Sequence, residues 1–390
     1  MRFLINYEHN LIQIVRKILK ILKMTVLVIL LAILLIILIS IVFIKISPQF
    51  GGKANKAQIE AYTKLGHYKD GKFQNEIITK MDFNMASFFS QMWNASPKKH
   101  PRTDIAVEKI DSLTIANYKE EKTRLTWFGH SSFLLEMDGK IILIDPMFGE
   151  VPAPHPWLGS NRYSAELPIT IEKLPYIDAV IFSHDHYDHL DYGSIQKLKH
   201  KVGEYFTPLG VGNHLVAWGV AKEKVHQLNW WDEIMFEDIK LVCTPARHFS
   251  GRGVSDRSAT LWSSWVIKGK QDNIYFSGDS GYGPHFKKIG EKFGPFDISM
   301  MECGQYNNDW EAIHMMPEQT AQAAVDLNSK LMLPIHWGAF TLAFHEWTDP
   351  VERVTVKAGE LGMPITTPKI GEVLIVGDSL FPREQWWLKY

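Results

Sequence analysis

The stretch Ser183-His184-Asp185-His186-Tyr187-Asp188-His189-Leu190-Asp191 decides the fold, and its pattern H-x-H-x-D-H places three imidazoles and a carboxylate within six positions. It follows the apolar, β-branched residues 177–182, which predict a buried strand. Side chains where a strand ends and the chain turns are held rigidly and still face an open cleft. Imidazole and carboxylate without thiolate favour a reactive zinc, iron or manganese site over a closed structural zinc. We therefore interpret the stretch as a metal-binding turn rather than a histidine-rich surface turn.

Length and composition indicate one large catalytic domain with extensions. The chain has 390 residues, of which 46% are hydrophobic and 22% charged, as in an ordinary folded protein. Its formal net charge of −1 gives no global field for nucleic acid, so we expect no nucleic-acid partner. Cys243 and Cys303 form no Cys-x-x-Cys pattern, which excludes a cysteine-rich structural site. Buried free thiols are favoured, and a disulfide is left open.

The N-terminal region predicts a membrane anchor. Residues 24–44 contain no charged side chain, and about 20 such residues span a bilayer core of about 30 Å. This run is too long for a cleavable signal, so we expect an uncleaved anchor rather than a buried core helix. Residues 10–23 are basic and have helical periodicity, which fits either a helix at an anionic membrane surface or a continuation of the next helix. Basic residues before the span predict a single-pass cell-membrane protein with its catalytic part outside the cytoplasm.

The rest of the pattern predicts four segments. These are a basic cytoplasmic or juxtamembrane segment (1–23), the transmembrane anchor (24–44), an extension packing on the catalytic domain (45–122) and the catalytic domain (123–390). The extension is expected to contain a helix at 81–93. Strand-like runs at 124–137 and 140–145 are joined by Asp138-Gly139, a hairpin signal. Later strands and helices (192–199, 317–327 and 350–361) predict an α/β (α+β) fold with two sheets and helices outside them.

Three further candidate ligands follow predicted strands, as the opening motif does. His248 comes after the strand that holds Cys243, Asp279 follows residues 273–277, and His336 follows residues 331–335. Taken alone, each is more simply a turn or capping residue. Together, downstream of the histidine motif, they predict one convergent site.

These residues carry a resemblance to the metallo-β-lactamase fold superfamily. The chain is most similar to the N-acyl-phosphatidylethanolamine-hydrolysing phospholipase D family, and ascorbate-6-phosphate lactonase-like proteins share fewer motifs. The resemblance covers about residues 50–382. The matching stretches are Thr126-Trp127-Phe128-Gly129-His130-Ser131-Ser132, Ile144-Asp145-Pro146-Met147-Phe148, Gly278-Asp279-Ser280-Gly281-Tyr282, Phe293-Gly294-Pro295-Phe296-Asp297 and His336-Trp337-Gly338-Ala339-Phe340.

The resemblance implies a four-layer αββα sandwich with two Zn²⁺ ions between the sheets. Carried over by position, the first zinc would be held by His184, His186 and His248, the second by Asp188, His189 and His336, and Asp279 would bridge them. Asp188 would also orient the attacking water, and His130 and Asp145 would support the ligands. His314, before Pro317-Glu318, is the candidate for binding phosphate or assisting the leaving group; a simple helix-start role is equally compatible.

The function predicted is that of a membrane-anchored zinc hydrolase acting on a phosphodiester, with N-acyl-phosphatidylethanolamine or a related phospholipid as the expected substrate. Residues 306–314 depart from the animal enzymes by lacking a basic stretch, which puts the same head group in doubt. A lactonase or small-molecule phosphoesterase is the alternative. A di-iron redox protein is disfavoured, because His186 stands where di-iron relatives have a carboxylate and no flavin domain is expected to follow. A non-catalytic metal scaffold fits poorly with so complete a ligand set. The sequence leaves open whether the protein forms a homodimer.

Overall fold

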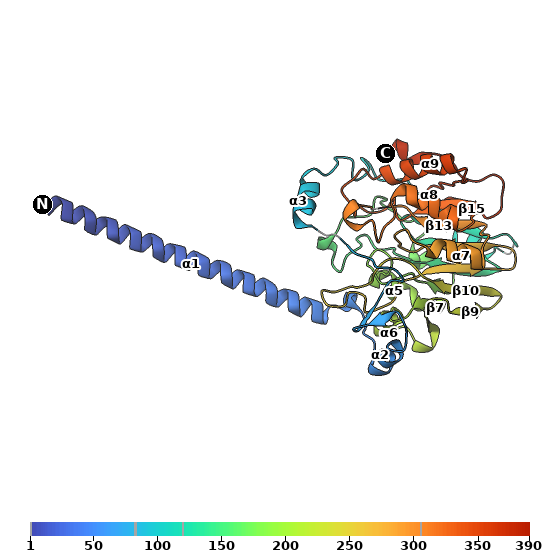
Figure 1. The fold of residues 1–390 in the computed structure, drawn as a ribbon, viewed down its shortest axis with the longest axis horizontal. Helices are drawn as coiled ribbons and strands as arrows, with labels where there is room; N and C mark the ends of the chain where they lie inside the picture. Colours follow the sequence, from blue (N-terminus) through green and yellow to red (C-terminus); the bar gives the residue numbers. More distant parts are fainter. Residues whose placement is uncertain (1, 82–83, 119–120, 305) are drawn as a thin grey trace. The chain divides into compact units, whose positions relative to one another are not determined.

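The computed structural model describes residues 2–81, 84–118, 121–304 and 306–390, and the chain divides into two compact units, Met1–Phe50 and Gly51–Tyr390. The first unit consists of one long helix, α1 (Arg2–Ile46), and a short 3-10 turn, η1 (Pro48–Phe50) (Figure 1). Residues 10–23 therefore continue the apolar helix rather than forming a separate one. The part His9–Ile46, 38 residues, is apolar and long enough to cross a membrane.

The second unit contains two large sheets. The seven-stranded sheet has the order β15 (Val373–Ile375), β3 (Arg124–Trp127), β4 (Phe133–Met137), β5 (Lys140–Ile144), β6 (Ile177–Ile181), β7 (Val202–Pro208) and β8 (Val225–Leu228). The six-stranded sheet has the order β14 (Met332–Ile335), β13 (Ile298–Glu302), β12 (Asn273–Phe276), β11 (Ser264–Lys268), β10 (Ile239–Thr244) and β9 (Glu233–Phe236). Each sheet therefore combines hairpin strands with parallel crossover strands.

The alternation of side chains along the strands builds an αββα sandwich, as predicted. In β4, Phe133 and Leu135 point into the core between the sheets, whereas Leu134 packs on the helix side. The helices over the seven-stranded sheet are α5 (Tyr192–Leu198) and α6 (Gly212–Ala217). Those over the six-stranded sheet are α7 (His285–Phe293), α8 (Pro317–Asp326) and α9 (Asp349–Leu361). Figure 1 shows α6 and α9 on opposite sides of this unit.

The expected hairpin at Asp138-Gly139 is confirmed, but the single strand expected at 124–137 is wrong. Asp138 and Gly139 have φ of 49° and 73°, the left-handed pair that a tight two-residue hairpin turn requires, and Met137 pairs with Lys140. Residues 128–132 leave the sheet, because Gly129 and His130 have φ of 86° and 56° and reverse the chain between β3 and β4. This turn lifts His130 out of the sheet.

The described residues between 51 and 122 form only short elements. They are α2 (Lys56–Tyr62), β1 (Tyr68–Lys69), β2 (Lys72–Phe73), α3 (Met85–Trp93) and α4 (Ser112–Ala116). The helix expected at 81–93 begins at Met85, where Asn84 caps it by accepting from the backbone N–H of Ala86 and Ser87; residues 82 and 83 lie outside the described part. The remaining 3-10 turns are η2 (Pro156–Leu158), η3 (Ile171–Lys173), η4 (Lys222–Lys224), η5 (Asn308–Trp310) and η6 (Trp386–Lys389).

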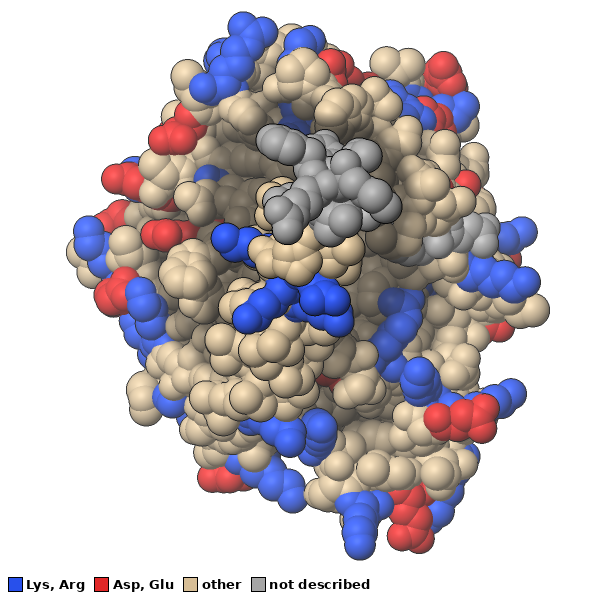
Figure 2. Space-filling model, turned by 90° about the vertical axis from the view of Figure 1, so that its left-hand side faces the viewer, with Lys and Arg blue, Asp and Glu red and all other residues tan. Residues whose placement is uncertain are grey.

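Charged side chains are mixed on the surface. Figure 2 shows Lys and Arg interspersed with Asp and Glu around the rim of one face, in keeping with the net charge of −1. Mixed charge of this kind produces no single-sign field around this rim.

Candidate metal centre

The candidate ligands come together because their strands end at one place. β12, β13 and β14 are parallel, and β10 runs the same way because β11 is antiparallel to both β10 and β12. Their carboxyl ends therefore share one sheet edge. The end of β6 in the other sheet is tied to this edge, since the backbone N–H of Ser263 donates to Ser183 O at 2.9 Å. The side chains that follow these strands consequently face one another between the two sheets.

The first group of side chains consists of His184, His186, His248 and Asp279, whose potential ligand atoms lie within 4.8 Å of one another. Nδ1 of His186 is 2.9 Å from Nε2 of His184 and 3.1 Å from Nε2 of His248. Oδ2 of Asp279 is 3.8 Å from both of those Nε2 atoms. Three imidazole nitrogens and a carboxylate oxygen facing one point form the kind of donor set that zinc and related ions prefer.

The second group contains Asp188, His189 and His336, and the structure adds His130 to it. Nε2 of His336 is 3.3 Å from Oδ2 of Asp188, and Nε2 of His189 is 3.6 Å from the same oxygen. His130, for which a supporting role was predicted, places its Nε2 2.9 Å from Oδ2 of Asp188. It therefore lies at the edge of the ligand group itself.

Asp279 contacts both groups, which is the position predicted for a bridging carboxylate. Its Oδ2 is 3.0 Å from Nε2 of His336, and its Oδ1 is 3.1 Å from Nε2 of His189. Among the described residues, Oδ1 of Asp279 and the Nε2 atoms of His189 and His336 are buried without any hydrogen bond of acceptable geometry. Buried polar atoms need a partner. The donor set, with these unpartnered atoms converging, therefore fits a pair of metal cations.

The electrostatics of the cluster also favour positive charge at its centre. Burial lowers the pKa of His184 and His248 well below the usual value, so these rings are neutral donors. Burial alone would raise the pKa of Asp279, but the imidazoles of His189 and His336 outweigh it and hold that pKa well below normal. Conversely, burial would lower the pKa of His336, but Asp279 and Asp188 raise it to about 10. The carboxylates therefore attract a cation, whether a proton or a metal ion.

Supporting hydrogen bonds orient the rings. Oδ2 of Asp145 is 2.7 Å from Nδ1 of His189, and Oδ1 of Asp145 accepts from the backbone N–H of Ser183 at 2.8 Å. Nδ1 of His184 is 2.9 Å from Oγ of Ser183, and Nδ1 of His248 is 3.0 Å from the carbonyl oxygen of Ile313. A partner on Nδ1 leaves Nε2 to face the centre of the site.

The backbone of the opening motif is also shaped by local sequence. Asp191 ends the metal-binding turn by capping α5, since its Oδ2 accepts from the backbone N–H of Ser194 at 2.7 Å. Gly278, which precedes Asp279, has φ of 54°, and a Cβ there would lie 2.7 Å from both the Ser183 side chain and Ser263 O. Glycine is therefore required where the two sheets meet beneath the ligands.

His314 lies beside the ligand groups. Its ring centroid is 5.0 Å from that of His248 and 5.2 Å from that of His336, and it forms a third group with Asp279 and His336. Its Nδ1 is 3.3 Å from Oε1 of Glu302, a fully buried carboxylate that also accepts from the backbone N–H of Met315 at 2.9 Å. This arrangement is compatible with the substrate-facing role predicted for His314. Sequence reasoning missed Glu302, whose only signal is an acidic residue at the end of an apolar strand.

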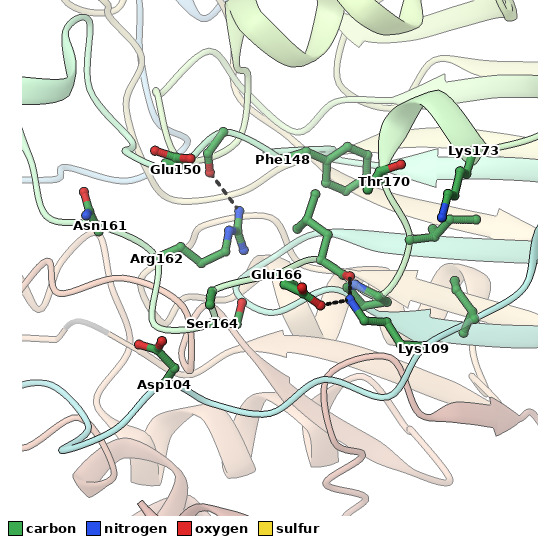
Figure 3. Close-up of a pocket in the computed structure, with 16 residues that line it drawn as sticks. Asp104, Lys109, Phe148, Glu150, Asn161, Arg162, Ser164, Glu166, Thr170 and Lys173 are labelled. Carbon is green, nitrogen blue, oxygen red and sulfur yellow. Dashed lines mark hydrogen bonds and ion pairs between the residues drawn. The ribbon is translucent and has the colours of Figure 1, made fainter.

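A cavity of about 950 Å³ lies among residues 104–110, 148–150 and 161–173, and none of its lining residues is a candidate ligand (Figure 3). In Figure 3, Arg162 lies among these lining residues with Phe148 and Glu150 near it. The Arg162 guanidinium stacks 4.6 Å from the Phe340 ring centroid, and the Phe340 ring is 5.5 Å from that of His130. The cavity therefore lies beside the ligand cluster, and the candidate ligands are not among the residues that line it.

Comparison with known proteins confirms the predicted family resemblance. A family model described as a beta-lactamase superfamily domain matches residues 140–337. A Mycobacterium tuberculosis protein described as uncharacterized is 36% identical over 345 residues, covering 86% of this chain and 91% of that one. The N-acyl-phosphatidylethanolamine-hydrolyzing phospholipase D 1 of Caenorhabditis elegans is 32% identical over 251 residues, covering 61% of this chain and 70% of that one. A possible metal-dependent hydrolase from Veillonella parvula shares the fold, with a TM-score of 0.52 at 17% identity over 65% of this chain and 99% of that one.

Proposed function

The chain belongs to the metallo-β-lactamase superfamily, and from this premise we propose that it is a membrane-anchored dinuclear zinc phosphodiesterase of the phospholipase D type. The proposed substrate is N-acyl-phosphatidylethanolamine or a related phospholipid. The single observation that supports it most is Asp279, whose two oxygens contact both ligand groups. The Caenorhabditis elegans relative, whose name gives this substrate, supports the substrate class.

The proposed ligands are those predicted from the sequence. One zinc would be held by His184, His186 and His248, the other by Asp188, His189 and His336, with Asp279 shared by both. Two bound zinc ions supply a water of lowered pKa and neutralise the charge that develops on phosphoryl oxygens.

The chain's own residues would then direct the bond changes. Oδ2 of Asp188 is held by Nε2 of His130 at 2.9 Å, and its Oδ1 is proposed to orient the attacking water. The water gives a proton to Oδ1 of Asp188, and its oxygen bonds to phosphorus as the bond from phosphorus to the ethanolamine oxygen breaks. His314 is proposed to give a proton to that leaving oxygen, yielding phosphatidic acid and an N-acylethanolamine.

The anchor fits a lipid substrate. The helix His9–Ile46 is proposed to hold the enzyme in the cell membrane as a single-pass protein, with residues 45–122 as an extension of a catalytic domain at 123–390 outside the cytoplasm. A tethered enzyme meets lipid at a high effective concentration. A protease-protection assay on sealed membranes tests the orientation, since digestion of the catalytic unit from the cytoplasmic face would contradict it.

The test of the function is hydrolysis by the detergent-solubilised full chain. We expect the wild-type chain to bind about two zinc ions and to release N-acylethanolamine from N-acyl-phosphatidylethanolamine in mixed micelles. We expect His184→Ala to lose zinc and to lose this activity. His200→Ala is the matched control, because His200 is exposed. Full activity in His184→Ala would overturn the metal assignment. Hydrolysis of lactones or soluble phosphoesters, without hydrolysis of the lipid, would support the alternative function of a lactonase or small-molecule phosphoesterase.

A further inference from the structure

The segment from Gly51 to Asn75 contacts the turns that carry the first ligand group. It is anchored on the catalytic unit near its end, where the buried Phe73 side chain enters the core between the sheets. The backbone N–H of Phe73 donates to Ser258 O at 2.9 Å. This anchor positions Asn75, which follows two residues later.

At one end of the segment, Asn75 pairs with the backbone of His248. Its Nδ2 donates to His248 O at 2.8 Å, and its Oδ1 accepts from the backbone N–H of His248 at 3.1 Å. The indole Nε1 of Trp262 also donates to the same Oδ1 at 3.0 Å, which orients the amide. A carboxamide offers a donor and an acceptor side by side, so it reproduces the pairing that a neighbouring strand would supply.

At the other end, Gly52 is linked to the H-x-H turn through His214. The backbone N–H of Gly52 donates to Nδ1 of His214 at 3.1 Å, so Nε2 of that ring carries the proton and donates to Oδ2 of Asp185 at 3.2 Å. Asp185 stands between His184 and His186, and its Oδ1 accepts from the backbone N–H of Gly251 at 2.8 Å. The described contacts thus run from the start of the segment to the turn that carries two of the ligands.

Gly52 lies too close to α6 to carry a side chain. A Cβ at Gly52 would lie 2.3 Å from Asn213 O and 2.9 Å from the Ala217 side chain. By contrast, a Cβ at Gly66, in the same segment, would meet nothing within 4 Å. The close approach at Gly52 is what allows its N–H to reach His214.

We infer that residues 51–75 act as a brace of the metal site, with Asn75 and His214 as positioning residues that hold His248 and the His184–His186 turn. The inference rests on the proposed metal site but is independent of the substrate. Ligands must be held within about 0.5 Å of their working geometry, and removing supporting hydrogen bonds typically weakens metal binding. The segment that follows the anchor helix is thereby a part of the metal site.

Asn75→Asp tests the brace with the smallest possible change, because it keeps the acceptor and removes the donor to His248 O. We expect zinc affinity, measured by competition with a chelator on the full chain, to fall roughly 10- to 100-fold. The visible spectrum of the cobalt(II)-substituted protein is expected to change as well, because it reports the ligand geometry directly. Gln74→Glu is the matched control: it introduces the same charge at the exposed neighbouring position and is expected to leave both readouts unchanged.

Gly52→Ala tests the contact at the start of the segment, with Gly66→Ala as its control. His214→Gln tests the link from Gly52 through His214 to Asp185. Circular dichroism and urea unfolding identify any variant that does not fold. If Asn75→Asp does not fold, the zinc affinities of Gly52→Ala and His214→Gln test the brace instead. Zinc affinity and cobalt spectra that match the controls in folded variants would overturn the brace. A wild-type chain that binds zinc but hydrolyses no phosphodiester defeats the proposed function alone, whereas a chain that binds no metal defeats both.

Discussion

Oδ2 of Asp279 lies 3.0 Å from Nε2 of His336, joining the ends of β12 and β14 across the intervening β13. The same carboxylate faces His184 and His248 on its other side. Because the pair is fully buried between two sheets, its charge is not screened by water. One carboxylate therefore contacts side chains of both donor groups.

Asp279→Asn keeps the shape of this side chain and removes its charge, so both metal positions are expected to weaken. We expect fewer than one tightly bound zinc per chain by elemental analysis and a loss of hydrolysis of at least about 100-fold. Asp104→Asn, at an exposed carboxylate, is the control and is expected to retain both. Two zinc ions retained in Asp279→Asn would show that this residue does not bridge.

His314→Ala is expected to lower kcat by roughly 10²- to 10⁴-fold while zinc content stays at the wild-type level, because His314 is proposed to act on the substrate. The loss should depend on the leaving group. A p-nitrophenyl phosphodiester releases a stable anion that needs no proton, so its hydrolysis should fall much less than that of an ethanolamine ester. Equal losses on both substrates would contradict a proton-donating role.

The buried ion pair of Arg124 and Glu136 gives a stability prediction. Nε of Arg124 donates to Oε2 of Glu136 at 2.9 Å, and both side chains are nearly excluded from solvent. Arg124→Met leaves the carboxylate unpaired and is expected to lower the free energy of unfolding by about 3–5 kcal/mol in urea denaturation. Breaking the exposed pair of Lys197 and Glu172 by Glu172→Gln should leave the free energy of unfolding almost unchanged, because water screens this pair. Equal costs would show that the Arg124 pair is solvated.

His285 predicts a pH dependence of stability. Burial first, and then Arg247 and Lys288, lower the pKa of this ring to about 3, so it is neutral in the folded chain. The unfolded chain, with a histidine pKa of about 6.5, binds a proton that the folded chain does not. Stability is therefore fully present above about pH 6.5 and is lost as the pH falls toward 3, by up to roughly 1.4 kcal/mol per pH unit.

His285→Gln removes this proton uptake. We expect the difference in unfolding free energy between wild type and variant to narrow steadily as the pH is lowered from 6.5 to 4. Other buried histidines contribute equally to both proteins and cancel in the difference. Parallel curves over that range would mean that His285 is not a neutral buried ring.

Much of the architecture could be read from local pattern. The Asp138-Gly139 hairpin, the helix that begins at Pro317 and the strand before the histidine motif each depend on neighbouring residues, through turn conformation, helix capping and apolar periodicity. The turn at residues 128–132 was missed because Gly129 and His130 lie within an otherwise strand-like run. Left-handed backbone at a histidine is selected by tertiary contacts and leaves no local signal.

In the candidate site, too, some residues could be predicted from local sequence and others could not. His184, His186, Asp188 and His189 were identifiable because metal donors at that spacing are rare outside metal-binding turns. Asn75 and Glu302 were not, because a single amide or carboxylate is common in any sequence. Their contacts with His248 and His314 exist only because distant segments fold onto the same sheet edge.

The sequence by itself indicated the class of fold, the apolar helix and the candidate metal donors, since each depends on residue spacing and composition. Only the tertiary structure decided that Asp279 faces both donor groups, that His130 joins the second group, and that residues 51–75 brace the first. The physical reason is that these relationships depend on which strand ends meet. That meeting is set by the packing of two sheets on a shared apolar core, to which residues throughout the catalytic unit contribute.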